Sequence, residues 1–174
     1  MTPAYDVSQP DPLRTSLEEQ LTRMRGGGPL PQPLLDVRAE TVEAAGEALR
    51  IVRPRDWDEL RHQEGAEGRT APYWAIAWPS GLALADALDG RDLADARVLE
   101  LGCGLAIPSL VAARRGARVV ATDGSPDAVV FAAHNFVFAA HNFALNDLEG
   151  EAAEVDWRDA GSRTSRRCCG CCRV

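Results

Sequence analysis

The stretch from residue 97 to residue 123 constrains the fold most strongly. It reads in order as an apolar strand (RVLEL, 97–101), a tight GCG turn, a helix (107–115) and a second apolar strand (117–122) that ends in Asp123. Pro108 suits the first turn of that helix, where its missing N–H costs nothing. A strand, a helix and a strand in fewer than thirty residues predict a βαβ unit with parallel strands and a right-handed crossover. The predicted fold class is therefore open α/β and Rossmann-like.

The glycine turn and Asp123 predict what this unit binds. In open α/β folds, ligands bind beyond the carboxyl ends of the strands, where Gly102 and Gly104 would let the backbone approach without Cβ interference. Asp123 ends the next strand, 19 residues after Gly104, and its carboxylate can accept both hydroxyls of a ribose. The pattern predicts an adenosine-containing cofactor.

Two residues disfavour a dinucleotide as that cofactor. The GxGxxG pattern needs a third glycine at position 107, where Ile107 stands, so the close helix approach used for a pyrophosphate is missing. Glu100, just before the turn, would repel a pyrophosphate but suits a cationic ligand, such as a sulfonium that carries an ammonium group. S-adenosylmethionine is such a ligand, and NAD and FAD are disfavoured.

The segment VLELGCGLA resembles motif I of the class I, seven-strand S-adenosylmethionine-dependent methyltransferases. That motif reads hydrophobic-hydrophobic-E-x-G-x-G-x-G, and Ala106 replaces its third glycine here. The resemblance implies that Glu100, Gly102 and Gly104, with Cys103 between the glycines, face the methionine part of the cofactor. It implies that Asp123 faces the ribose. The alternative is a βαβ turn that binds no ligand.

Two further segments extend this resemblance. PYWAIAWPSGLALADAL resembles the segment before motif I in the branch that contains protein-lysine methyltransferases and nicotinamide N-methyltransferase-like proteins, and it implies that Trp78 lies beside the cofactor. In the alternative reading, Tyr73, Trp74 and Trp78 only cap the core. The resemblance also implies a third strand that ends at residues 155–157, with Asp156 on the adenine amino group and Trp157 on the ring. A solvated turn carboxylate is the alternative for Asp156.

The chain is predicted to have three parts. Residues 1–69 form a mostly helical N-terminal extension, with helices near 16–25 and 39–48 and a short edge strand at 49–52. A partial methyltransferase domain covers 70–160, including a helix at 81–88. An aberrant or disordered Arg/Cys-rich tail covers 161–174.

A tandem repeat and the tail carry unusual patterns. VFAAHNF occurs at 130–136 and again at 137–143, and seven residues make nearly two helical turns, so the helix keeps its buried face. Duplication explains the spacing of His134 and His141 better than a metal site does. The tail cysteines are nearly contiguous and lack the separated ligands of a zinc site, so we predict no metal and interpret the tail as the product of a frameshift.

Composition limits the classes of partner. The net charge of −7 disfavours nucleic acid and anionic membranes. No signal peptide or membrane span is visible, which predicts a cytoplasmic protein. The expected partner is a methyl-acceptor protein or a small amine.

The predicted function is S-adenosylmethionine-dependent N-methylation of a protein lysine or a small amine. Only the first three of the family's seven strands are expected, so the chain is predicted to be truncated and inactive. Strand 97–101 would then lie at the sheet edge, and Val98, Leu99, Leu110 and Val111 would lose cover. The alternative is a non-catalytic adenosyl-ligand-binding or regulatory module, and an NAD-dependent oxidoreductase ranks third. No catalytic residue is assigned.

Overall fold

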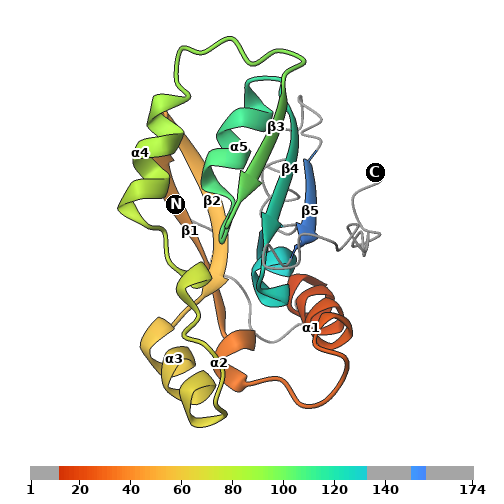
Figure 1. Cartoon of the computed structure of the whole chain (residues 1–174). Coiled ribbons are helices and arrows are strands. Elements are labelled where there is room, and N and C mark those ends of the chain that lie inside the picture. The colour runs from red at the N-terminus through yellow and green to blue at the C-terminus, as the bar shows by residue number, and fades with distance from the viewer. Residues whose placement is uncertain (1–11, 133–149, 156–174) are drawn as a thin grey trace.

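The structure is a computed structural model that describes residues 12–132 and 150–155. Its elements are, in chain order, α1 (Pro12–Met24), α2 (Gln32–Leu35), β1 (Val37–Ala44), β2 (Glu47–Pro54), α3 (Trp57–Ala66), η1 (Tyr73–Ala75), α4 (Pro79–Ala87), β3 (Arg97–Leu101), α5 (Ile107–Arg114), β4 (Arg118–Asp123) and β5 (Gly150–Glu154) (Figure 1). Residues 126–132 form a further helical stretch. The predictions for His134, His141, the second copy of the repeat, Asp156, Trp157 and the tail cysteines lie outside the described residues.

The three later strands form a parallel sheet in the order β3-β4-β5. In its register, Leu99 lies opposite Val120 and Leu101 opposite Thr122. Helix α5 connects β3 to β4, and its residues from Ile107 to Ala113 are buried. This confirms the predicted mixed α/β fold with a parallel βαβ unit, and the bounds of its elements agree to within one residue.

The prediction of a helix at 39–48 is wrong. Strands β1 and β2 pair there as an antiparallel hairpin, with Ala44 opposite Glu47. Ala45 and Gly46 form the two-residue turn with φ angles of 54° and 70°, which matches the positive φ that tight hairpin turns require at both positions. The backbone N–H of Ala45 donates to Asp86 Oδ1 of α4 at 2.6 Å. The predicted edge strand at 49–52 is part of β2, and among the described residues 12–69 the α-helices are α1, α2 and α3.

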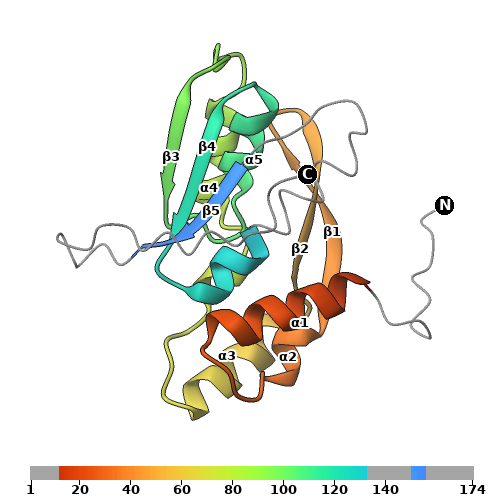
Figure 2. The ribbon, with the colours of Figure 1, turned by 90° about the vertical axis from the view of Figure 1, so that its right-hand side faces the viewer.

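The elements are stacked in layers. In the side view, α4 and α5 lie between the three-stranded sheet and the β1-β2 hairpin, while α1, α2 and α3 lie together at one end (Figure 2). The strand arrows of β3 and β4 point toward that end (Figure 1). The carboxyl ends of the parallel strands therefore face the helices of the N-terminal segment.

Two hydrophobic clusters join residues before and after position 69. One packs Leu49 and Ile51 of the hairpin with Leu110 of α5. The other packs Leu17 of α1 with Phe131 and their neighbours. Burial of such side chains contributes about 1.5–3 kcal/mol each, so the N-terminal segment shares its core with the parallel sheet.

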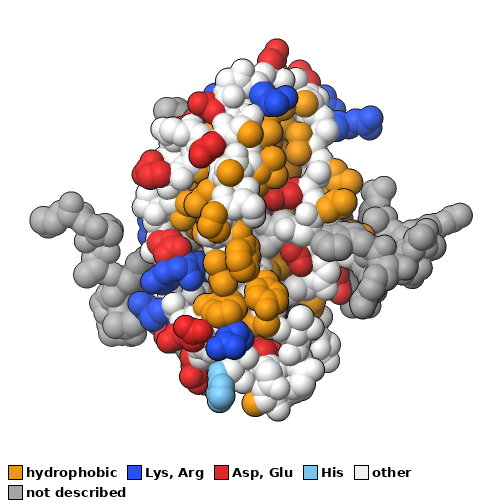
Figure 3. Space-filling view, turned by 60° about the vertical axis from the view of Figure 1, so that its left-hand side comes forward, with side chains coloured by type: hydrophobic (Ala, Val, Ile, Leu, Met, Phe, Trp, Pro, Cys, Tyr) orange, Lys and Arg blue, Asp and Glu red, His pale blue; other side chains and the backbone are white. Residues whose placement is uncertain are grey.

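One face of the sheet carries exposed apolar side chains. Among the described strands, β3 has β4 as its one hydrogen-bonded neighbour, and Leu99 and Leu101 are 63% and 62% exposed. The expected loss of cover is confirmed for Leu99, but it is wrong for Leu110 and Val111, which are buried within α5. Figure 3 shows hydrophobic side chains gathered in a strip along one face of the molecule.

Among the residues described, no helix combines the length and the apolar character that crossing a bilayer would require.

Candidate functional site

A cavity of about 1160 Å³ lies at the carboxyl ends of β3 and β4. The six predicted site residues that the structure describes all line it: Trp78, Glu100, Gly102, Cys103, Gly104 and Asp123. Its other side is formed by residues of α1, α3 and the segments that follow them. The position agrees with the rule that open α/β folds bind ligands at this edge of the sheet.

Asp123 is held in place by two backbone amides. Gly104 N donates to Oδ2 at 2.9 Å, and Ser125 N donates to Oδ1 at 2.9 Å. Each carboxylate oxygen has two lone pairs, so each can accept one further hydrogen bond. The carboxylate is therefore oriented at the cavity with capacity for two hydroxyl donors.

Glu100 caps the helix that follows the turn. Ala106, at the N-cap of α5, makes no side-chain cap, and Glu100 Oε2 instead accepts hydrogen bonds from Ser109 N at 3.1 Å and from Ser109 Oγ. Burial raises the pKa of Glu100, the Ser109 bonds oppose that rise, and the charge of Asp123 adds to it. An amide that would otherwise face a bound anion is thus paired with a carboxylate.

The electrostatics of the turn favour a cation over a phosphate. Gly104 N and Ser109 N both donate to carboxylates of the chain itself. A pyrophosphate at the helix start would need such amides and would meet the charges of Glu100 and Asp123. The residues fit the positively charged S-adenosylmethionine better than a dinucleotide.

Gly104 lies in close contact with another segment of the chain. Its φ is +49°, and a Cβ added there would lie 3.0 Å from the backbone oxygen of Trp74. The sequence argument assigned the missing Cβ to the approach of a ligand; in the structure, the backbone of Trp74 takes that space. The absence of a side chain at Gly104 therefore allows the turn to pack closely against the segment before α4.

Cys103 is buried between the two glycines. Its backbone N–H donates to Thr122 O at 2.9 Å, which ties the turn to β4. Burial is the main cause that raises the pKa of the thiol, and the charges of Asp123 and Glu100 raise it further. The thiol stays protonated and is therefore a poor nucleophile.

The three aromatic residues of the PYWAIAW segment behave differently from one another. Trp74 is half-buried, packs on Phe131 with ring centroids 4.9 Å apart and also lines the cavity, so it belongs to both the core and the site. Tyr73 and Trp78 are 55% and 45% exposed and line the cavity. Their exposure favours the reading in which these two residues face the cavity.

An ion network on the opposite side of the cavity was missed by sequence reasoning. Arg25 binds Asp127 through Nε at 2.8 Å and Nη2 at 2.5 Å, and it binds Glu64 at 3.1 Å. Glu64 also pairs with Arg69. The bond to Asp127 is the main cause that raises the pKa of Arg25. No local pattern marks these residues, because the Arg25–Asp127 pair spans 102 positions.

Comparison with known proteins gives two partial matches, and no family model matches the chain. It is 40% identical over 55 residues to the histone-arginine methyltransferase METTL23 of Xenopus laevis, which is 30% of this chain and 24% of that protein. It is 45% identical over 62 residues to the electron transfer flavoprotein beta subunit lysine methyltransferase of Danio rerio, 34% of this chain and 24% of that protein. The chain thus matches about a quarter of the length of each curated relative. Over about a third of its own length, it is similar to protein methyltransferases.

Proposed function

We propose that this chain is an S-adenosylmethionine-dependent methyltransferase that methylates nitrogen in a protein lysine or a small amine. One observation carries the proposal: the Asp123 carboxylate is fixed beside the Gly102–Gly104 turn at the carboxyl edge of parallel strands. The similarity to two protein methyltransferases supports it. Because one relative is named for arginine and the other for lysine, a protein substrate is the favoured acceptor.

In this proposal each residue of the turn binds one part of the cofactor. Asp123 accepts the ribose hydroxyls, while Glu100 and the turn with Gly102, Cys103 and Gly104 face the methionine part. Trp78 lies beside the cofactor. Asp156 and Trp157, outside the described residues, are assigned to the adenine.

The chain's contribution to catalysis is mainly positional. Bound S-adenosylmethionine supplies a methyl group on a positively charged sulfur. The residues of the cavity would hold the acceptor nitrogen beside the bound cofactor, and keeping the two reactants together would lower the barrier without a dedicated acid or base. We therefore assign no catalytic residue.

A second function, a non-catalytic adenosyl-ligand-binding module, is favoured by the exposed face of β3. Leu99 and Leu101 lie on the strand that leads directly into the glycine turn. A strand with such exposure is less firmly held than a covered one. The expected lack of turnover stays a prediction.

Two measurements on the purified chain test the proposal. Isothermal titration with S-adenosylhomocysteine and with NAD should give binding of the first and none of the second. Transfer of a tritiated methyl group from S-adenosylmethionine to proteins of a cell lysate then separates an enzyme from a binding module. Binding of NAD in preference to S-adenosylhomocysteine would overturn both functions.

A further inference from the structure

The cavity has room for a second ligand beside the cofactor. Its volume of about 1160 Å³ exceeds the range of about 300–1,000 Å³ typical of pockets for one small molecule. The cavity is lined by the glycine turn and Asp123, and also by Arg69, Thr70 and Tyr73. The cofactor proposal assigns no ligand to Tyr73.

Tyr73 lies between two other aromatic rings, those of Trp57 and Trp78. The ring centroids of Tyr73 and Trp78 are 6.0 Å apart, and Trp57 packs on Tyr73 at 6.3 Å. The indole N–H of Trp78 donates to Tyr73 O at 2.8 Å, and that of Trp57 donates to Pro72 O at 2.9 Å. These hydrogen bonds to the backbone fix the two indole rings, and their contacts with Tyr73 restrain the ring of Tyr73. Rigid exposed rings bind a ligand at low entropic cost.

The charge around these rings favours a positively charged ligand. The cavity is lined by five carboxylate residues, which are Glu64, Glu67, Glu100, Asp123 and Asp127, against Arg25 and Arg69. Both arginines are already bound to carboxylates. An anionic ligand would therefore meet net repulsion.

The Trp57 ring already holds a cation. The guanidinium of Arg61 lies 5.2 Å from the ring centroid of Trp57, and Trp57 does not line the cavity. Among the described residues, no such contact is made on Tyr73 or Trp78. Aromatic faces of this kind attract ammonium and guanidinium groups within about 6 Å.

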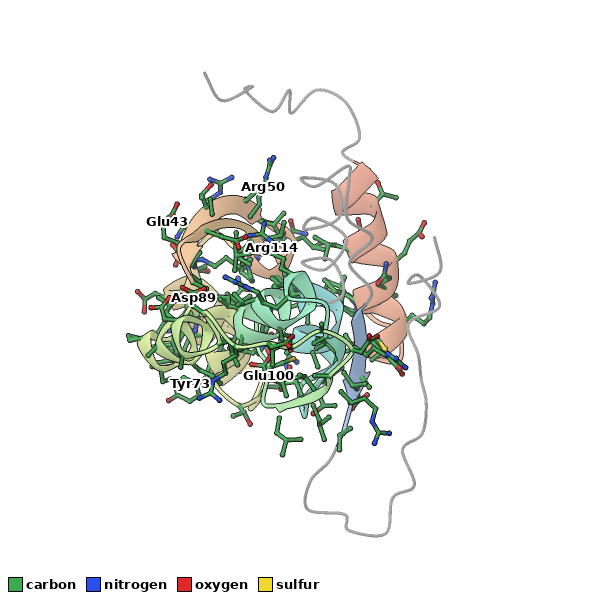
Figure 4. The ribbon with its side chains drawn as sticks, turned by 90° about the horizontal axis from the view of Figure 1, so that it is seen from above. Glu43, Arg50, Tyr73, Asp89, Glu100 and Arg114 are labelled. Carbon is green, nitrogen blue, oxygen red and sulfur yellow. The ribbon has the colours of Figure 1, made fainter. Side chains whose placement is uncertain are left out.

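We propose that Tyr73, next to Trp78 on the cofactor side, is an acceptor-binding residue of the cavity and binds the cationic side chain, of the lysine or arginine type, of a protein substrate. This inference rests on the proposed methyltransferase function, because it names the substrate class of that site. Seen from above, Glu100 lies near the middle of the molecule and Tyr73 nearer its rim (Figure 4). A substrate side chain entering past Tyr73 would reach toward the glycine turn.

The test uses the full chain saturated with S-adenosylhomocysteine. The probes are N-acetyl-lysine methylamide, N-acetyl-arginine methylamide and the neutral N-acetyl-norleucine methylamide, titrated while the indole N–H resonances are followed by NMR. At least one cationic probe should bind more tightly than the neutral probe. Comparison of the two cationic probes shows whether the site prefers an ammonium or a guanidinium group. Equal binding of all three would overturn the inference.

Variants then locate the site. Tyr73→Ala should weaken the binding of the cationic probe about 3- to 10-fold, while Tyr73→Phe, which keeps the ring face, should change it less than about 2-fold. Leu84→Ala is the matched control, because Leu84 is exposed but does not line the cavity. An unchanged affinity in Tyr73→Ala would overturn the inference.

Affinity for S-adenosylhomocysteine is measured in the same variants and should not change. Loss of that affinity in Tyr73→Ala would assign Tyr73 to the cofactor and overturn the inference, leaving the proposed function intact. If the wild-type chain fails to bind S-adenosylhomocysteine, the proposed function fails. Titration of the free protein with the lysine probe still decides whether Tyr73 binds a cation.

Discussion

The two sides of the cavity use carboxylates in opposite ways. On the sheet side, Asp123 and Glu100 accept hydrogen bonds from backbone amides and from Ser109. On the N-terminal side, Glu64 and Asp127 are bound to the side chains of Arg25 and Arg69. Among the described residues, the amide-bound carboxylates pair with no positive side chain and keep spare lone pairs, whereas the arginine-bound ones are paired with a positive charge.

The two sides therefore differ in how far apart in the sequence the groups lie that position their carboxylates. On the sheet side, the carboxylates are positioned by groups that belong to short, local turns. The N-terminal side joins α1, α3 and the helical stretch 126–132 through long side chains. Substitutions on the sheet side should change ligand affinity most, and those on the N-terminal side should change stability most.

The largest expected effect is on the N-terminal side. Arg25→Ala should lower the free energy of unfolding by about 3 kcal/mol, because it leaves Asp127 buried without its partner. Urea denaturation measures the loss. Arg55→Ala is the matched control: the Arg55–Asp36 pair is 58% and 61% exposed, and its loss should cost less than about 1 kcal/mol. Equal effects in both variants would show that the ion network does not hold the two parts together.

The next effect is on the sheet side. Asp123→Ala should weaken the binding of S-adenosylhomocysteine by about 1–3 kcal/mol, because a charged acceptor for two hydroxyls is lost. Asp123→Asn keeps the size of the side chain and removes only its charge and one acceptor, so an intermediate affinity is expected. Isothermal titration measures both, with thermal unfolding as the control for folding. Unchanged affinity in a folded Asp123→Ala would contradict the ribose assignment.

A pH-dependent effect distinguishes Glu100 from the ion-paired carboxylates. Burial raises the pKa of Glu100 above the ordinary value of 4.5. The folded chain therefore binds more protons than the unfolded chain just above that pH, and the free energy of unfolding contributed by Glu100 falls as pH rises through this range. Glu100→Gln keeps an acceptor for Ser109 and should remove this decline. Denaturation of both proteins between pH 4 and pH 7 measures the difference, and parallel curves would contradict the assignment.

The smallest effect concerns the third position of the glycine pattern. Ala106 has φ 61° and ψ 30°, a left-handed conformation that costs an alanine about 1–2 kcal/mol. Ala106→Gly removes this conformational cost. The benefit is offset by about 0.5–1 kcal/mol of chain entropy and by about 0.8 kcal/mol for the loss of a buried methyl group. The free energy of unfolding should change by less than about 1 kcal/mol. A larger loss would show that the Ala106 methyl group is needed in the core.

The sheet side was predictable because its determinants are local. The glycine turn, the Pro108 helix start and the strand that ends in Asp123 lie within one continuous segment, and the structure places them at one cavity. What the glycines contact was not predictable. Gly104 packs against Trp74, which is 30 positions away in the sequence.

The N-terminal side was less predictable for the same reason. Residues 39–48 are rich in alanine and glutamate, which favours a helix when propensity alone is considered. Pairing along the whole hairpin and the contact of Ala45 with Asp86 prevail over that preference. Arg25 and Glu64 gave no signal, since their roles depend on contacts between distant segments.

The hairpin turn also bears on how the chain folds. Tight turns such as Asn-Gly start hairpins locally, whereas here Ala45 adopts a disfavoured positive φ and its amide is bound by Asp86, 41 positions later. A hairpin whose turn depends on so distant a partner should form slowly, because the intervening loop must close first. We expect β1 and β2 to complete their pairing only after α4 has docked. Asp86→Ala should then speed unfolding while leaving the folding rate nearly unchanged.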